Sequence, residues 1–370
     1  MSWIKNLMLM FFSIFLILTV AELGIRQILG HPLEISGVYK RVMLFEAVPN
    51  FKNEGDIFKY HPNTEFRSVT FYVNPDEKTA VKEYDVKIKT NNLGLVQLNH
   101  ISDNTIVDLF IGDSFTEGHG ASPWFYNLES ERVDQIKAVN GGIVGTGPLQ
   151  WLELSRLLQE QHGLNYRKTT VILIHQDITR PVWNFAPHYI VCLNTGKCEK
   201  NTHPWYGYVF DDGTEINMEE YAIKKYLSQN IDLNIDVKKD DLSRFIIRAS
   251  ALAYYTNAFY DEFIKEGQLV KIDSPIDFNE IEIKNLTAIK SIYQSGSDQG
   301  KVLLIPEKHE VGEFSVQLSP KSNKILEWFR KNKLAVNVCK SLRSRDFHVN
   351  DGHPNGNGYM KIKECVGELQ

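Results

Sequence analysis

Short apolar runs alternate with amphipathic stretches along this 370-residue chain, and this alternation limits its fold more than any other feature. Four runs have the length and composition of buried strands: 106–111, 136–139, 169–174 and 302–305. Three stretches have helical spacing of their apolar residues: 148–161, 281–293 and 323–331. Strands that alternate with such helices form βαβ units. The sequence therefore predicts an α/β fold with a mostly parallel sheet that helices cover on both faces.

Two regions interrupt this alternation. Residues 27–104 hold short alternating runs, at 70–73 and 84–88, which predict strands of a linker and small β extension. The stretch of about 185–296 is predicted to be an insertion into a main domain that covers residues 105–370. Inside the insertion we expect a hairpin and a helix, with strands at 206–210 and 214–218 and the helix at about 242–265.

The N-terminal segment is apolar from residue 7 to residue 21, with only Ser13 and Thr19 as polar interruptions. As a helix this run spans about 22 Å of a hydrocarbon core of about 30 Å, and it approaches bilayer length if it continues past Glu22. Two interpretations stay open: a retained signal anchor over residues 1–26, which we favour, and a cleaved secretory signal. A buried helix is disfavoured, because a helix that is apolar all round needs a core around it.

Composition excludes several classes of protein. Apolar residues make up 43% and charged residues 24%, which is typical of a folded soluble body rather than a disordered, coiled-coil or polytopic membrane chain. The net charge is -5 and no basic block is present, so nucleic acid is not a predicted partner. Four cysteines allow two disulfides after export, and we expect neighbours to pair, Cys192 with Cys198 and Cys339 with Cys365. Four unpaired thiols remain the alternative.

A candidate nucleophile follows the first predicted strand of the main domain. Gly112-Asp113-Ser114 comes directly after the run at 106–111. A serine at the end of a strand can present its hydroxyl and a backbone N–H in the same direction, as an acyl nucleophile with half an oxyanion hole requires. An ordinary helix cap is the alternative, because Asp and Ser both cap helices well.

A candidate base lies near the other end of the chain, in Asn350-Asp351-Gly352-His353-Pro354. A histidine whose loop also carries a carboxylate can act as a general base, because the carboxylate orients the ring and stabilises the imidazolium. Taken alone, such a motif is ordinarily a loop with a solvated histidine.

These blocks, in this order and with Asn140-Gly141-Gly142-Ile143-Val144-Gly145 between them, resemble the SGNH or GDSL hydrolase superfamily. The resemblance covers residues 105–180 and 300–370. It extends to residues 90–95, which look like the segment before the nucleophile block in membrane-anchored bacterial members. It implies a three-layer α/β/α fold with a flavodoxin-like sheet. It also implies that Ser114 is the nucleophile, His353 the base and Asp351 its orienting partner.

The resemblance further implies an oxyanion hole built from the backbone N–H groups of Ser114 and Gly145, and here the chain departs from the family. The third block normally ends in an Asn that donates to the oxyanion, whereas this chain has Gln176. Loss of one oxyanion donor costs about 100- to 1000-fold in turnover. Many members also place the acid three residues before the histidine, where this chain has Asn350. Asp351 fits a shorter spacing seen in some polysaccharide-acetylating relatives.

We therefore expect an exported serine esterase or O-acyltransferase that acts on an acylated glycan or another ester of the cell envelope. The resemblance places it in the bacterial inner membrane through a single N-terminal helix, with its catalytic domain in the periplasm. The alternatives are a binding or scaffold protein with a decayed oxyanion hole, and an intracellular lipase-like protein. No cofactor and no metal are predicted, because His175, His188 and His203 lack metal-ligand spacing. The oligomeric state is left open.

Overall fold

The computed structural model describes most of the chain, and its contacts divide it into two compact units. The described residues are 2–29, 40–46, 51–54, 57–74, 78–131, 136–182, 202–203, 207–210, 217–227, 250–260 and 277–367. Among them, the first unit holds the N-terminal helix α1 (Ser2–Leu29), helix α8 (Ala251–Tyr260) and residues 312–314. The second unit holds the other described residues.

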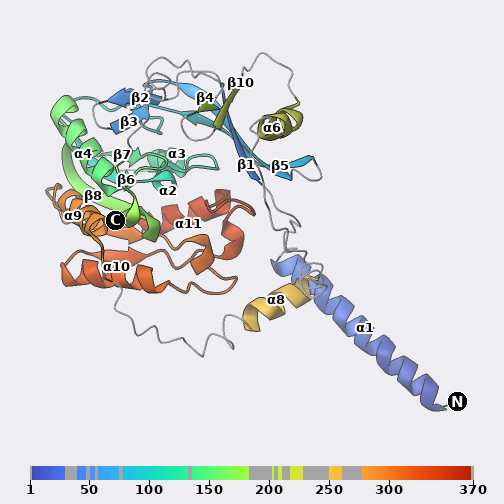
Figure 1. Ribbon diagram of the computed structural model, residues 1–370. Coiled ribbons are helices and arrows are strands. Elements are labelled where there is room, and N and C mark those ends of the chain that lie inside the picture. The colour runs from blue at the N-terminus through green and yellow to red at the C-terminus, as the bar shows by residue number, and fades with distance from the viewer. Residues whose placement is uncertain are drawn as a thin grey trace. The chain divides into compact units, whose positions relative to one another are not determined.

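Helix α1 contains a 21-residue stretch, Met8–Ile28, that is long and apolar enough to cross a membrane. A signal sequence near an N-terminus has the same length and composition. The one carboxylate in this stretch, Glu22, accepts hydrogen bonds from the backbone N–H groups of Ala251 (2.9 Å) and Leu252 (2.8 Å). It thereby pairs amides at the start of α8 that have no partner within that helix. Figure 1 shows α8 beside the C-terminal end of α1.

The predicted helix at 242–265 is described only over α8, and the rest of it lies outside the described residues.

The second unit contains the predicted parallel sheet. Its described strands are β6 (Ile106–Gly112), β7 (Lys137–Gly142), β8 (Asn165–Leu173), β11 (Lys301–Leu304) and β12 (Val336–Val338). They lie in the order β7-β6-β8-β11-β12, and every neighbouring pair is parallel. The first four confirm the four predicted runs. Strand β12 was not predicted, because it has three residues and none of them is fully buried.

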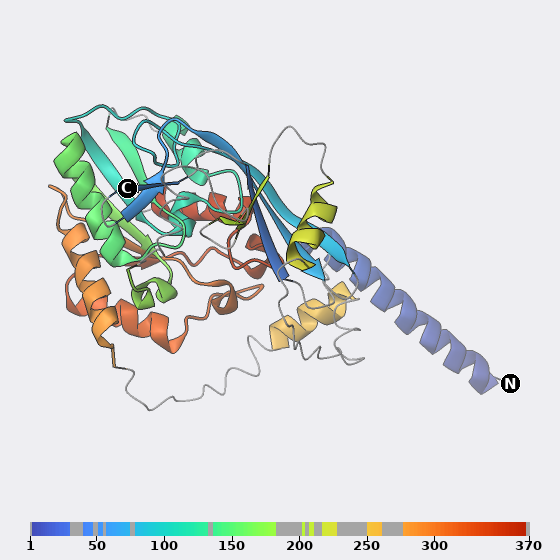
Figure 2. The same ribbon diagram turned by 45° about the horizontal axis from the view of Figure 1, so that its top comes forward.

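Three of the helices next to this sheet, at 148–162, 280–293 and 320–331, lie where the apolar spacing predicted them. The described helices next to this sheet are α3 (Trp124–Glu131), α4 (Pro148–His162), α9 (Glu280–Tyr293), α10 (Pro320–Lys331) and α11 (Gly356–Gly367). Helix α4 begins with Pro148 and ends at Gly163, which takes the left-handed conformation that favours glycine. Helix α9 begins with a capping box between Asn279 and Glu282. Figures 1 and 2 show α4 and α9 side by side.

The strands of this sheet send alternate side chains into two separate apolar clusters, as the period of a β-strand requires. In β6, Leu109 packs in a cluster with residues of α4, α9 and α10, whereas Phe110 packs in a cluster with residues of α3 and α11. Leu173 and Ile172 of β8 divide in the same way. Both faces of the sheet are therefore buried, which leaves the ends of the strands as the places where polar groups can gather.

A second, mostly antiparallel sheet contains the predicted β extension. Its described strands are β1 (Lys40–Glu46), β4 (Glu65–Asn74), β5 (Thr79–Lys89), β9 (Thr202–His203) and β10 (Gly207–Phe210), in the order β5-β4-β1-β10-β9. A separate hairpin pairs β2 (Phe51–Glu54) with β3 (Ile57–Tyr60). The runs predicted at 70–73 and 84–88 lie within β4 and β5 and are confirmed.

The predicted hairpin of the insertion is partly wrong. The antiparallel partner of β10 is β9, which precedes it in the chain. Met218, the predicted end of the second strand, instead begins helix α6 (Met218–Leu227). The physical reason lies in Asn217, whose side chain accepts a hydrogen bond from the N–H of Glu220 (3.3 Å) and so caps the helix. Residues 211–216 lie outside the described residues.

A disulfide joins Cys339 to Cys365 in α11, with their Cα atoms 5.5 Å apart, as predicted from the pairing of neighbours. By loop entropy such a bridge contributes about 3 to 4 kcal/mol to the stability of the fold. The other predicted pair, Cys192 with Cys198, lies outside the described residues.

Candidate active site

The turn after β6 places Ser114 at the carboxyl end of the parallel sheet. Asp113 caps the short helix α2 (Ser114–Glu117), because its Oδ1 accepts the N–H of Phe115 at 2.9 Å. Gly112 is required at this turn, since a Cβ there would lie 2.1 Å from Oγ1 of Thr116 and 2.2 Å from the carbonyl oxygen of Ile172. The sequence left a helix cap as the alternative interpretation of this motif. In the structure Asp113 caps the helix, and the hydroxyl of Ser114 makes other contacts.

The structure brings together the three residues of the predicted triad from positions 239 apart in the chain. Nε2 of His353 lies 2.8 Å from Oγ of Ser114, and Nδ1 of His353 lies 2.6 Å from Oδ1 of Asp351. With a proton on Nδ1 donated to the carboxylate, Nε2 is the acceptor for the serine hydroxyl. A second acceptor for that hydroxyl, Oδ2 of Asp113, lies farther away at 3.3 Å.

Asp351 is buried, yet its surroundings favour the charged form. Burial alone would raise the pKa of Asp351, but the charge of His353 and the hydrogen bond to it, followed by the charge of Arg41, lower that pKa well below its usual range. The nearest guanidinium nitrogen of Arg41 lies 3.4 Å from Oδ2, and the hydroxyl of Tyr84 lies 3.5 Å from the same oxygen. Arg41 comes from β1 and Tyr84 from β5. The small β extension therefore contacts the acid of the triad directly.

Asn350, at the position where many family members carry the acid, faces another partner. Its backbone N–H and side-chain amide donate to the carboxylate of Glu83 at 2.9 and 2.7 Å. The acid that contacts His353 is thus Asp351, two residues before the histidine.

His119 lies beside the triad as a neutral ring. Its centroid is 4.8 Å from that of His353, and it is almost completely buried. Burial, followed by the nearby charges of His353 and Arg41, lowers the pKa of His119 well below its usual value. Its Nε2 lies 3.0 Å from the hydroxyl of Tyr84 and 3.2 Å from Arg41. A neutral ring in this place can accept these hydrogen bonds without repelling the base.

The loop after β7 carries Gly145, one of the predicted oxyanion donors. Its backbone takes a φ of 76°, in the left-handed region that favours glycine. The preceding residue, Val144, donates its N–H to Oε2 of Glu117 at 2.6 Å. Burial raises the pKa of Glu117 to about 8, although the hydrogen bond from Val144 and the nearby hydroxyl of Tyr60 in β3 lower it. Glu117 therefore ties helix α2 to the loop of Gly145.

Gln176 follows β8 in the 3-10 helix η1 (His175–Thr179). Together with Ser114 and His353 it lines a cavity of about 670 Å³. Its amide is already engaged, because Nε2 donates to Oε2 of Glu307 at 2.7 Å and its backbone N–H lies 3.1 Å from Oε1. An amide carries two N–H groups, so this bond leaves one donor for the cavity.

Besides Arg41, two further cations of the site were missed by the sequence analysis. Arg180 donates to the carboxylate of Asp113 (3.1 Å) and to the carbonyl of Thr146 (2.8 Å), and it forms an ion pair with Asp177 (2.8 Å), so it links three motif blocks. The sequence signal that could have identified Arg180 is its place three residues after Asp177 of the third block.

The other missed cation is Lys308, which donates to the carbonyl oxygens of His348 and Val349, at 2.6 Å each. It lies 3.4 Å from the carbonyl oxygen of Asp351 and so holds the loop that carries Asp351 and His353. Nothing local in the sequence marked it.

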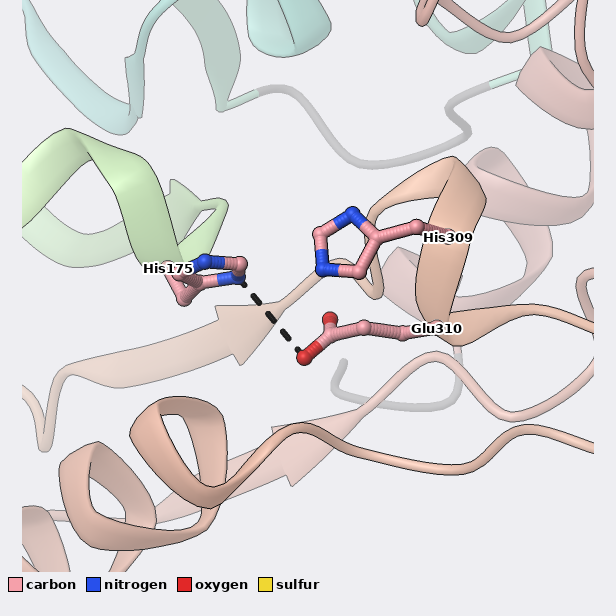
Figure 3. A group of neighbouring side chains, drawn as sticks. All are labelled: His175, His309 and Glu310. Carbon is pink, nitrogen blue, oxygen red and sulfur yellow. Dashed lines mark ion pairs between the residues drawn. The ribbon is translucent and has the colours of Figure 1, made fainter.

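A group of side chains that could hold a metal lies beside the cavity (Figure 3). Ligand atoms of His175, His309 and Glu310 lie within 4.8 Å of one another. Burial alone would lower the pKa of His175, but the carboxylates of Glu307 and Glu310 raise it to about 9. Of the other histidines considered in the sequence, His203 lies in β9 and His188 lies outside the described residues.

We compared the chain with known proteins. No protein-family model matches it, and no curated protein matches it.

Proposed function

We propose that this protein is an SGNH-type serine esterase or O-acyltransferase with a three-layer α/β/α domain. The observation that carries the proposal is the continuous path from the hydroxyl of Ser114 through both ring nitrogens of His353 to the carboxylate of Asp351, with links of 2.8 and 2.6 Å. The strand order β7-β6-β8-β11-β12 corresponds to the flavodoxin-like order 2-1-3-4-5, which supports the same fold.

The proposed mechanism uses an acyl-enzyme. Ser114 attacks the ester carbonyl while His353 takes its proton, and Asp351 stabilises the imidazolium. The N–H groups of Ser114 and Gly145, with the remaining N–H of Gln176, stabilise the tetrahedral oxyanion. His353 then gives the proton to the leaving alcohol as the C–O bond breaks. Water gives hydrolysis, or a sugar hydroxyl gives transfer, when it attacks the acyl-enzyme with His353 as base and releases the Oγ of Ser114.

The proposed setting is the bacterial cell envelope, with an acylated glycan or a related ester as substrate. Helix α1 supports a single-pass anchor in the inner membrane. The disulfide between Cys339 and Cys365 supports an oxidising compartment such as the periplasm for the catalytic domain.

A binding or scaffold protein is the second candidate, and one observation favours it. The amide of Gln176, where the family has its third oxyanion donor, is bonded to Glu307 at 2.7 Å. If both N–H groups of Gln176 face away from the oxyanion, the site loses a donor that is worth about 100- to 1000-fold in turnover.

Hydrolysis of an aryl acetate by the purified full chain in detergent separates these candidates. The esterase proposal predicts turnover that Ser114→Ala abolishes and that Ser102→Ala, a change at an exposed serine, leaves intact. A folded wild-type chain with no more turnover than Ser114→Ala would favour the scaffold.

A further inference from the structure

Four side chains at the carboxyl ends of two neighbouring strands form what we call the His175 cluster: His175, Glu307, His309 and Glu310. Strands β8 and β11 are paired in parallel, with Leu173 opposite Leu304. The segments that follow them, η1 and the 3-10 helix η4 (Lys308–Glu310), therefore lie side by side. Figure 3 shows His175, His309 and Glu310 pointing toward one another from these two segments.

Ligand atoms of His175, His309 and Glu310 lie within 4.8 Å of one another, close enough for one ion, and Glu307 lies next to them. Nδ1 of His175 lies 3.0 Å from Oε1 of Glu307 and 3.7 Å from Oε1 of Glu310, and Nδ1 of His309 lies 3.6 Å from Oε2 of Glu307. Ligand atoms at about 2.0 to 2.2 Å from a tetrahedral zinc ion are separated by about 3.4 Å. His309 has an exposed side chain (59%), so it can move the remaining distance and leaves an entry path from solvent.

The carboxylates are oriented by donors from outside the cluster. Oε1 of Glu310 accepts hydrogen bonds from the N–H of Ser319 (2.8 Å) and the hydroxyl of Ser322 (2.6 Å). Glu307 is held by Gln176 through the two bonds given above. Outer-shell donors of this kind fix the direction of metal-binding carboxylates in known sites.

His175 is a member of the cluster with a buried ring nitrogen that has no hydrogen-bond partner among the described residues. Its Nδ1 is buried, and no described residue makes a hydrogen bond of suitable geometry with it, although Oε1 of Glu307 lies 3.0 Å away. The nearby guanidinium of Arg180 is already paired with Asp113 and Asp177. A divalent cation with two neutral imidazoles and two carboxylates would balance the cluster.

We propose that His175, His309, Glu310 and Glu307 bind one divalent ion of the zinc class. Two imidazole nitrogens with two carboxylate oxygens suit Zn²⁺ and its neighbours among the transition metals better than Mg²⁺ or Ca²⁺, which prefer oxygen ligands alone. The ion would hold Glu307 and, through it, the amide of Gln176 in the wall of the cavity. This metal site is independent of whether Ser114 acts as a nucleophile.

Calorimetric titration of the metal-depleted full chain in detergent with Zn²⁺ tests the site. We expect one ion per chain, and at least about tenfold weaker binding in His309→Ala, because even the loss of an outer-shell partner costs that much. Glu310→Gln should weaken binding in the same way. His100→Ala removes an exposed histidine outside the cluster and serves as the matched control, and Ser114→Ala should bind Zn²⁺ as the wild type does.

The spectrum of the Co²⁺-loaded chain gives a second readout. Tetrahedral coordination by nitrogen and oxygen produces visible bands that the His309→Ala variant should lose while it stays folded by circular dichroism. No binding of Zn²⁺ to the folded wild type would overturn the proposal, and so would equal affinities of the wild type and His309→Ala.

Discussion

The two sheets of the second unit contribute to the candidate catalytic centre in different ways. The parallel sheet presents Ser114 at the end of β6, in a turn whose Asp113 and Gly112 are explained by local geometry. The mostly antiparallel sheet contributes Arg41 and Tyr84 from within its strands, and both approach Oδ2 of Asp351. The proposed nucleophile thus comes from the end of a parallel strand, and the groups that surround the proposed acid come from an extension without a motif.

The comparison shows that the extension is part of the site. Its strand β1 brings a cation to the acid, and β3 brings the hydroxyl of Tyr60 to Glu117, which in turn holds the loop of Gly145. If these contacts matter for chemistry, changes in either sheet must lower activity, and those at the parallel sheet must lower it more.

The largest effect is expected from Asp351→Asn. The change keeps the shape of the side chain but removes the charge that orients His353, and in a serine triad such a loss lowers kcat by about 10⁴-fold. Steady-state hydrolysis of an aryl acetate measures it. A loss below tenfold would mean that Asp351 does not serve as the acid.

A smaller loss is expected from Gln176→Ala. If the free N–H of the amide faces the oxyanion, kcat should fall by about 100-fold while KM changes little, because an oxyanion donor acts in the transition state. Gln176→Asn, which restores the amide of the family, serves as the comparison. Unchanged kcat in Gln176→Ala would show that the backbone N–H groups of Ser114 and Gly145 suffice.

Arg41→Met tests the contribution of the antiparallel sheet. Loss of the cation beside Asp351 leaves a carboxylate that holds a proton on His353 more strongly, so the acidic limb of the pH profile of kcat/KM should move to higher pH. We expect kcat to fall by about tenfold, since small displacements of catalytic groups cost up to about 100-fold. Arg41→Lys should restore part of the activity. An unchanged pH profile would show that Arg41 acts only through packing and not through its charge.

The last prediction concerns stability rather than activity, at Glu117 between the two regions. Its carboxyl has an ordinary value of 4.5 and a pKa of about 8 in the fold, because burial disfavours the charge. The stabilisation of the neutral form is therefore fully present below pH 4.5 and is lost as the pH rises through about 8. Glu117→Gln should flatten this loss, which reaches at most about 1.4 kcal/mol per pH unit. Chemical denaturation at pH 5 and pH 8 measures the free energy of unfolding. An equal fall of this free energy with pH in the wild type and in Glu117→Gln would contradict the prediction.

Much of the parallel sheet could be predicted because its strands carry their own signal. The runs at 106–111 and 169–174 are apolar on both faces, and the helices after them have regular spacing and recognisable caps, as with Pro148 and Asn279. Strand β12 is short and only partly buried, so no run marks it. The predicted hairpin is wrong at Met218, because the side chain of Asn217 caps a helix that begins there.

The candidate site also has residues that could be predicted from the sequence and residues that could not. Ser114, Asp351 and His353 lie in short motifs at the ends of elements, where local sequence reports local geometry. Arg41, Tyr84 and Lys308 reach the site through pairings between distant segments, which a single sequence does not encode in any local pattern. The cluster of His175 with His309 was hidden for the same reason, because it depends on the adjacency of β8 and β11.

Reaction of the full chain with a fluorophosphonate, followed by mass spectrometry of the proteolytic peptides, tests the central claim most directly. A serine activated by His353 should form a covalent phosphonyl adduct on Ser114 alone, and the rate of labelling should fall steeply in His353→Ala. Folded protein that stays unlabelled, or that carries the adduct on another residue, would contradict the assignment of Ser114 as the nucleophile.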